Sequence, residues 1–127
     1  MLLRLFALAL GVGLLVNGTA RADGDPAAGE KVFAKCRACH VADKPQNKVG
    51  PHLVGLFGRH AGTVEGFKYS DAMKEADITW DEETLDQYLA DPKGYIPKNR
   101  MIFPGLKTED ERENVIAYLR QATTASQ

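Results

Sequence analysis

The strongest constraint on this chain is a short segment that holds both of its cysteines, Cys36-Arg37-Ala38-Cys39-His40. Two thiols about one helical turn apart can each add to a vinyl group of the same porphyrin, and the histidine that follows then lies beside the iron. This CxxCH pattern is typical of covalent attachment of a c-type haem. We therefore expect one haem c, bound through Cys36 and Cys39, with His40 as an axial ligand of the iron.

A disulfide, a zinc site and a redox dithiol are weaker interpretations of the two cysteines. A disulfide between residues three apart closes too small a loop to constrain the unfolded chain appreciably. A structural zinc site needs four ligands, and the sequence has no second CxxC or paired histidines to complete one. A thioredoxin-like dithiol is expected within a βαβ unit, whereas the pattern of this chain is helical.

The first 22 residues have the three parts of a secretory signal peptide. Arg4 precedes an apolar run from Leu5 to Val16, and Ala20-Arg21-Ala22 fits an A-x-A cleavage site. Retention as a membrane anchor is the weaker alternative, because the run is shorter than the roughly 20 residues that cross a bilayer core. We expect cleavage after Ala22, export to the periplasm, and no stable membrane insertion of the cleaved chain.

Residues 23–127 are enough for one domain, but hydrophobic burial alone would leave a domain of this size marginally stable. A bound cofactor could complete its core. The formal net charge of the whole chain is −1, and removal of Arg4 and Arg21 makes the remainder more acidic. This balance argues against nucleic acid as a partner.

Helix signals dominate the rest of the sequence, and β-branched residues are too scattered to indicate strands of more than a few residues. Asp25-Pro26 predicts the start of a helix that leads into Cys36. Thr79 and Glu82 have the spacing of a capping box, which predicts a second helix. That helix should end at Asp91, because the residue before a proline is pushed out of the α region.

Thr108 and Glu111 predict the start of the last helix in the same way, and a short helix is plausible over 71–76. Two long segments rich in Gly and Pro, 41–69 and 92–107, remain as loops. Loops of this length are uncommon in a compact domain unless they are functional. We expect both to pack against one bound group.

The sixth position on the iron has four candidate ligands in residues 23–127: Met73, Met101, His52 and His60. We favour Met101, because it lies in a loop stiffened by Pro97 and Pro104, which suits a thioether held against a metal. Met73 falls in the predicted short helix, where filling the core is the simpler role. The two histidines lie on a Gly-rich loop, where solvated or structural roles are more common.

An ordered set of motifs from about Gly29 to Leu119 resembles the class I c-type cytochromes, in the branch that includes mitochondrial cytochrome c and its bacterial periplasmic relatives. The motifs follow one another with the family's order and spacing. They are Gly29 and Phe33, CRACH at 36–40, KVGPHL at 48–53, GLFGR at 55–59, GFKY at 66–69, ITW at 78–80, Tyr88-Leu89, DPK at 91–93 and YIPKNRMIFPG at 95–105.

The resemblance implies an all-α fold around one haem, with the first and last helices crossing where Gly29 and Phe33 meet Tyr118. It implies that the Pro51 carbonyl accepts the His40 Nδ1 proton, which orients the ring and makes it a better donor.

The resemblance also implies further haem contacts. Arg59, Tyr69 and Trp80 are expected to hydrogen-bond a buried propionate, and Tyr88 and Asn99 to lie near the Met101 sulfur. Three positions depart from the family: Lys98 stands where glycine is usual, Pro104 follows Phe103, and Met73 stands where a polar residue near the haem is common.

An iron with His and Met ligands has no open site for substrate, so we expect a soluble, monomeric one-electron carrier that is not an enzyme. Its reduction potential should be raised by the soft thioether. The alternatives are a small-ligand binder or peroxidase in which Met101 is labile, and a subunit held in a larger complex.

We expect transient redox partners in a respiratory or related chain. A cytochrome bc-type complex fits as the donor, and an oxidase, reductase or reaction centre as the acceptor. Such encounters depend on charge steering for fast association. The expected basic cluster comprises Lys35, Lys48, Lys93, Arg100 and Lys107.

Overall fold

The computed structural model describes Gly13 and residues 24–124. The predicted signal peptide therefore lies outside the described residues, apart from Gly13. Five helices make up the regular structure of the described part: α1 (Pro26–Phe33), α2 (Asp71–Lys74), α3 (Glu82–Ala90), α4 (Pro92–Tyr95) and α5 (Glu109–Ala122). No strand occurs among these residues, only an isolated bridge between His60 and Thr79. The prediction of an all-α fold is confirmed.

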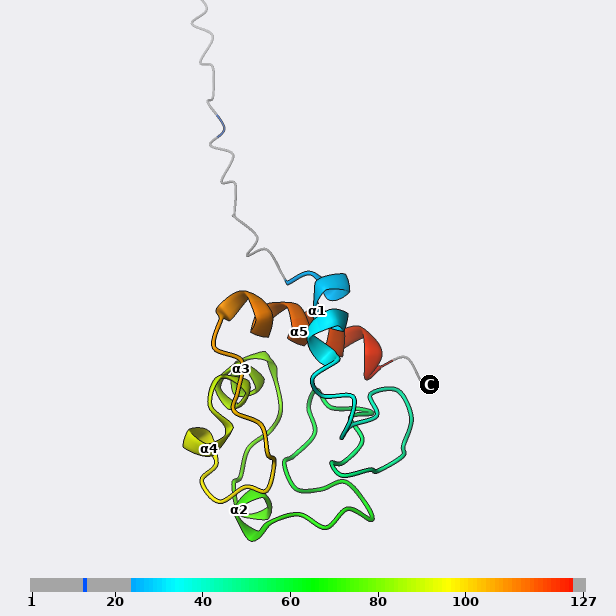
Figure 1. Cartoon of the computed structure of the whole chain (residues 1–127), viewed down its shortest axis with the longest axis vertical. Coiled ribbons are helices and arrows are strands. Elements are labelled where there is room, and N and C mark those ends of the chain that lie inside the picture. Colours follow the sequence, from blue (N-terminus) through cyan, green and yellow to red (C-terminus); the bar gives the residue numbers. More distant parts are fainter. Residues whose placement is uncertain (1–12, 14–23, 125–127) are drawn as a thin grey trace, which may run out of the picture.

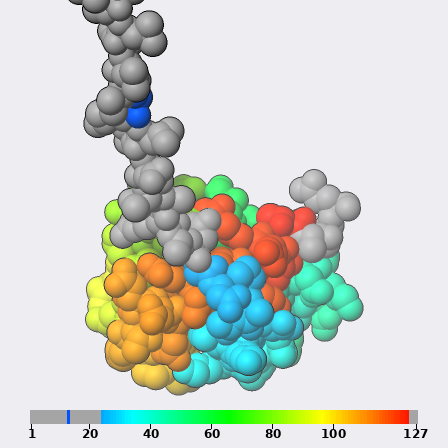
Figure 2. Space-filling model, turned by 90° about the horizontal axis from the view of Figure 1, so that it is seen from above, coloured from blue at the N-terminus to red at the C-terminus, as the bar shows by residue number. Residues whose placement is uncertain are grey.

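Helices α1 and α5 cross at the top of the molecule, as the resemblance implied (Figure 1). A Cβ atom on Gly29 would lie 1.8 Å from the backbone oxygen of Asn114 and 2.9 Å from Cβ of Tyr118. The rings of Phe33 and Tyr118 meet beside this point, with centroids 5.2 Å apart. Figure 2 shows α1 in blue against α5 in orange and red. Only glycine allows the two backbones to approach this closely.

The first helix begins where its sequence predicts, because the Asp25 carboxylate accepts from the Ala27 N–H at 3.0 Å and Pro26 takes the first helical position. The predicted capping box of the second helix is wrong. Its cap is Asp81, which accepts from the Thr84 N–H while the Thr84 hydroxyl accepts from the Asp81 N–H.

The physical reason for this shift is backbone pairing just before α3. Thr79 forms the bridge with His60, and the Trp80 N–H donates to the Arg59 carbonyl at 2.9 Å. Because residues 79 and 80 are held in extended pairing, the helix starts only at Glu82. The same helix ends at Ala90, one residue before Asp91, as predicted.

The cap of α5 is Thr108, as predicted, and its hydroxyl accepts from the Glu111 N–H at 3.4 Å. The Glu111 carboxylate bonds the Thr108 hydroxyl and Lys35 instead of the cap's backbone. The short helix predicted over 71–76 is found at Asp71–Lys74. The prediction of a continuous loop over 92–107 is wrong at its start, where Pro92–Tyr95 form α4 under an Asp91 cap.

One hydrophobic core joins these elements. Its buried members are Phe33, Ala42, Leu56, Ala61, Trp80, Leu85, Tyr88, Ile96, Leu106, Val115, Ile116 and Leu119. Cys36, Met73 and Met101 are partly buried and pack against this same cluster. In Figure 1 the loop that carries Met101 (yellow to orange) and the loop that follows His40 (teal) lie on different sides of the lower half. Residues of the expected cofactor site thus approach one core from separate segments.

Among the described residues, no helix has both the length and the apolar character needed to cross a bilayer.

Candidate haem-binding site

The cysteine segment continues the turns of α1 beyond its last residue. The Cys36 N–H donates to Phe33, and the N–H groups of Cys39 and His40 both donate to the Cys36 carbonyl, at 2.8, 3.0 and 2.9 Å. These turns set the two thiols about one helical turn apart. Both cysteines are free and partly exposed, and burial, together with Cys39, raises the pKa of the Cys36 thiol. Two separate thiols are what paired thioether attachment requires, and the disulfide alternative gains no support.

The zinc alternative also gains no support from the described part of the chain. Nowhere in it do three or more His, Cys, Asp or Glu side chains gather as a metal site would require.

The His40 ring is held on two sides. Its Nδ1 atom lies 2.7 Å from the Pro51 carbonyl oxygen, so Nδ1 carries the proton and Nε2 is left with the lone pair that can bind a metal. Gly50 packs against the ring, and a Cβ on this residue would lie only 2.4 Å from Cε1. Burial lowers the pKa of His40, against the opposite effect of the Pro51 hydrogen bond. The imidazole is therefore a neutral, oriented donor.

Met101 lies between α4 and α5 with its sulfur near a buried tyrosine. The Tyr88 hydroxyl is 3.8 Å from Sδ, and the Met101 N–H donates to Asn99 Oδ1 at 2.9 Å. Tyr88 is only 7% exposed, and burial raises its pKa, so the hydroxyl stays protonated and can donate to sulfur. The side chain of Asn99, expected near the sulfur, bonds the backbone of the same methionine.

Three residues were expected to bind a propionate. Arg59 donates from Nη1 to the carbonyls of His52 and Val54, both at 3.1 Å, and the Tyr69 hydroxyl accepts from the Val64 N–H at 3.1 Å. Burial lowers the pKa of Arg59 and raises that of Tyr69.

Arg59 is absent from the ion pairs of the described residues. A partly buried guanidinium that bonds only neutral carbonyls still lacks an anion, so its chemistry suits a carboxylate. Trp80 is buried, with its ring centroid 5.1 Å from that of Tyr88.

The remaining candidate ligands of the iron have protein partners. His52 Nδ1 accepts from the Val54 N–H at 3.2 Å, and His60 Nε2 lies 3.6 Å from Asp77 on the surface. Met73 packs against the core from α2. Met101 packs against the same core and differs from these groups in that its sulfur faces a buried hydroxyl, that of Tyr88.

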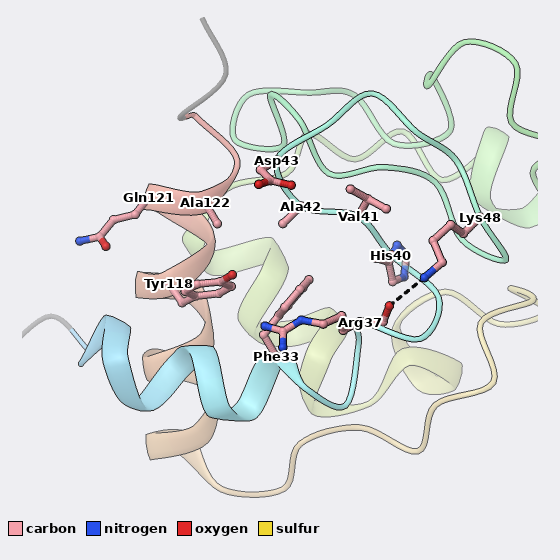
Figure 3. Close-up of a pocket in the computed structure, with 10 residues that line it drawn as sticks. All are labelled: Phe33, Arg37, His40, Val41, Ala42, Asp43, Lys48, Tyr118, Gln121 and Ala122. Atoms are coloured by element: carbon pink, nitrogen blue, oxygen red, sulfur yellow. Dashed lines mark hydrogen bonds between the residues drawn. The ribbon is translucent and has the colours of Figure 1, made fainter.

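A surface cavity of about 520 Å³ lies beside His40, between α1, α5 and the loop that follows the cysteine segment (Figure 3). Phe33, Val41, Ala42, Tyr118 and Ala122 form its apolar part, with Arg37, Asp43, Lys48 and Gln121 around them. Lys48 donates to the Arg37 carbonyl at 3.1 Å. Met101 does not line this cavity, so it is not the space between the two proposed ligands.

Two residues of the site have roles that the sequence does not predict. Gly50 is one of several glycines in its loop, and nothing in the sequence marks it as the residue under the His40 ring. Asn47 bridges the same loop, since Oδ1 accepts from the His52 N–H at 3.0 Å and Nδ2 donates to the Glu65 carbonyl at 3.2 Å. An asparagine in a polar loop gives no signal of such a link.

Comparison with known proteins gives the family to which this chain is similar. A family model described as cytochrome c matches residues 26–123. A cytochrome c of Chlamydomonas reinhardtii is 58% identical over 102 residues, which cover 79% of this chain and 91% of the relative. A cytochrome c2 of Blastochloris viridis is 53% identical over 98 residues, 76% of this chain and 77% of the relative. A cytochrome c-554 of Methylosinus trichosporium is 47% identical over 119 residues, covering 92% and 90%.

Proposed function

This chain belongs to the cytochrome c family and is a one-electron carrier with one covalently attached haem c; on this basis we propose that the haem is bound through Cys36 and Cys39 and lies between His40 and Met101. The donor set fits: two free thiols, an imidazole oriented for coordination through Nε2, and a thioether near a buried hydroxyl. The bound haem supplies the one-electron Fe(III)/Fe(II) chemistry.

The observation that carries the proposal is the 2.7 Å contact between His40 Nδ1 and the Pro51 carbonyl. It fixes both the tautomer and the direction of the ring, which a ligand requires and a solvated histidine does not. Met101 has the second anchored position, since both its backbone N–H and its sulfur have partners. If His40 and Met101 both held the iron, they would leave it no position for a substrate, which supports a carrier rather than an enzyme.

The surrounding residues of the site have supporting roles in this proposal. Arg59, Tyr69 and Trp80 bind a propionate, and the main support for that role is the Arg59 guanidinium, which bonds neutral carbonyls and no carboxylate among the described residues. Tyr88 donates to the Met101 sulfur. The soft thioether favours Fe(II), which raises the reduction potential relative to ligation by two histidines.

The partners proposed are acidic redox proteins that bind transiently at the basic cluster. All five members, Lys35, Lys48, Lys93, Arg100 and Lys107, are exposed. Lys35 differs from the others because it pairs with Glu111 at 3.1 Å. Lys48, Lys93 and Lys107 donate to backbone carbonyls, which orient the ammonium groups without cancelling their charge. These three should therefore contribute most to steering.

We place the carrier in the periplasm, with cleavage of the leader after Ala22. The support is the tripartite pattern of residues 1–22. N-terminal sequencing of the exported protein tests this point, and an intact leader would contradict it.

The central test uses purified holoprotein and Met101→Ala. Haem bound through thioethers should stay with the protein in acidified acetone. The ferric protein should show the weak far-red charge-transfer band of sulfur ligation, and the reduced protein should bind carbon monoxide poorly. Met101→Ala should lose the band and bind carbon monoxide readily. Extractable haem would refute the attachment, and avid carbon monoxide binding by the unmodified protein would instead support the small-ligand binder or peroxidase.

A further inference from the structure

The side chain of Asn99 connects the methionine loop to both ends of the short helix α4. It is 3% exposed, and its three side-chain hydrogen bonds all go to backbone groups. Nδ2 donates to the carbonyls of Pro92 and Ile96, at 2.7 and 2.8 Å, while Oδ1 accepts from the Met101 N–H at 2.9 Å. One amide thus joins the carbonyls of the first residue of α4 and of its C-cap to the backbone of the proposed ligand.

From this geometry we propose that Asn99 is the positioning residue that keeps Met101 on the iron and so closes the sixth coordination site. The inference rests on the proposed ligation by Met101. It differs from a contact with the sulfur, because Asn99 acts on the peptide backbone and through it on the side chain. Asparagine suits the position because donors and an acceptor on one short side chain can serve carbonyls and an N–H together.

The other contacts of the loop show why the positioning of Met101 depends on Asn99. Ile102, which follows Met101, is 99% exposed and gives the loop no buried anchor on that side. Beyond it, the Phe103 side chain packs against the core, and the Phe103 N–H donates to the Met101 carbonyl at 3.1 Å. Lys93 adds a second link from α4, since its ammonium donates to the Asn99 carbonyl. The backbone N–H of the ligand therefore has its partner on the α4 side, in Asn99.

Loss of the side chain would leave the Met101 N–H without its partner. The carbonyls of Pro92 and Ile96 would keep the N–H groups of Ile96 and Asn99, but the Met101 N–H would need water, which the loop can admit only by moving outward. That movement carries Met101 away from its ligating position. The expected result is a larger population of open protein, in which an external ligand competes for the iron.

The experiment measures imidazole binding to ferric holoprotein and the far-red sulfur-ligation band. Asn99→Ala should weaken the band and tighten imidazole binding roughly tenfold, which corresponds to about 1.4 kcal/mol. Asn99→Ser covers a failure of the alanine variant to fold. Its hydroxyl can accept from the Met101 N–H but cannot also reach both carbonyls, so we expect a smaller change, about threefold, in the same direction.

Two variants separate positioning from general loss of stability. Val115→Ala removes a side chain that is 1% exposed on α5, and Ile102→Ala trims the exposed neighbour of Met101. Both should bind imidazole within about twofold of the unmodified protein, even where Val115→Ala lowers the unfolding free energy as much as Asn99→Ala does. Equal tightening in Val115→Ala and Asn99→Ala at matched stability would overturn the role of Asn99, as would unchanged affinity in both Asn99 variants.

The unmodified holoprotein distinguishes failure of this inference from failure of the proposed function. If it shows the far-red band and the Asn99 variants behave like it, only the role of Asn99 fails. If it lacks the band, Met101 is not the ligand, and both proposals are overturned.

Discussion

Replacement of Gly50 by alanine tests how closely His40 is packed against its loop. The new Cβ would lie 2.4 Å from Cε1, 2.8 Å from Nδ1 and 2.9 Å from Nε2 of the imidazole, whereas ordinary contacts begin at 3.4 Å. The ring must therefore move by about 1 Å. Such a movement opens the 2.7 Å contact between Nδ1 and the Pro51 carbonyl beyond hydrogen-bonding distance.

The structure gives the size of the effect. Extra volume in a well-packed site costs about 1–3 kcal/mol, and loss of the Nδ1 hydrogen bond adds about 0.5–1.5 kcal/mol. We expect Gly50→Ala to lower the unfolding free energy by about 2–4 kcal/mol. Because the Nδ1 hydrogen bond makes the imidazole a stronger donor, its loss should destabilise the ferric protein more than the ferrous one and raise the reduction potential.

The assay is denaturant unfolding in both oxidation states, together with a redox titration of the holoprotein. Gly29→Ala is the control, because its Cβ would meet the Asn114 backbone oxygen at the helix crossing and not the His40 ring. It should destabilise both oxidation states equally and leave the potential unchanged. Equal losses in both states for Gly50→Ala, with an unchanged potential, would refute the reasoning.

Three further predictions follow from separate parts of the structure. Lys98 has a φ of +67°, a conformation that costs a residue with a side chain roughly 1–2 kcal/mol. Lys98→Gly should therefore raise the unfolding free energy by about 0.5–1 kcal/mol, after subtraction of the greater conformational freedom of glycine in the unfolded chain. A lower unfolding free energy in a denaturant titration would contradict this. Burial raises the pKa of Tyr88 in the folded protein. The protonated Tyr88 hydroxyl therefore contributes its full stabilisation below the pKa of an unfolded tyrosine, about 10, and this contribution is lost as the pH rises above that value toward the folded pKa. Tyr88→Phe should therefore lose less stability than the unmodified protein between about pH 8 and pH 11, and parallel losses would exclude the effect. Neutralising Lys48, Lys93 and Lys107 together with glutamine should slow association with an acidic redox partner, most at low salt. Lys35→Gln alone should have little effect because Glu111 already pairs with that lysine, and stopped-flow rates insensitive to all four changes would argue against steering.

The parts of the fold that could be predicted from the sequence depend on local chemistry. Asp25 and Thr108 cap helices because their side chains reach N–H groups two or three residues ahead, whatever the rest of the chain does. Gly29 could be placed at the crossing because the family resemblance supplied its partner. The left-handed φ of Lys98 accounts for the glycine usual at that position.

The parts that could not be predicted depend on distant contacts. Thr79 has a suitable side chain for a cap, but pairing with the segment at 59–61 holds it in an extended conformation, and Asp81 caps instead. The helix at Pro92–Tyr95 is too short to show an apolar period. The positions of Gly50 under the His40 ring and of Asn99 between α4 and Met101 depend on how two loops meet, which no local pattern encodes.

The contact between α1 and α5 has a consequence for the order of events during synthesis. The Asp25 N–H donates to Asn114 across 89 positions of the chain, and Gly29 meets the same late segment. A nascent polypeptide cannot complete this interface until nearly its whole length has left the ribosome. Until then, the thiols of Cys36 and Cys39 belong to a chain that has not closed, so the cysteine segment is made well before the contact between α1 and α5 can form.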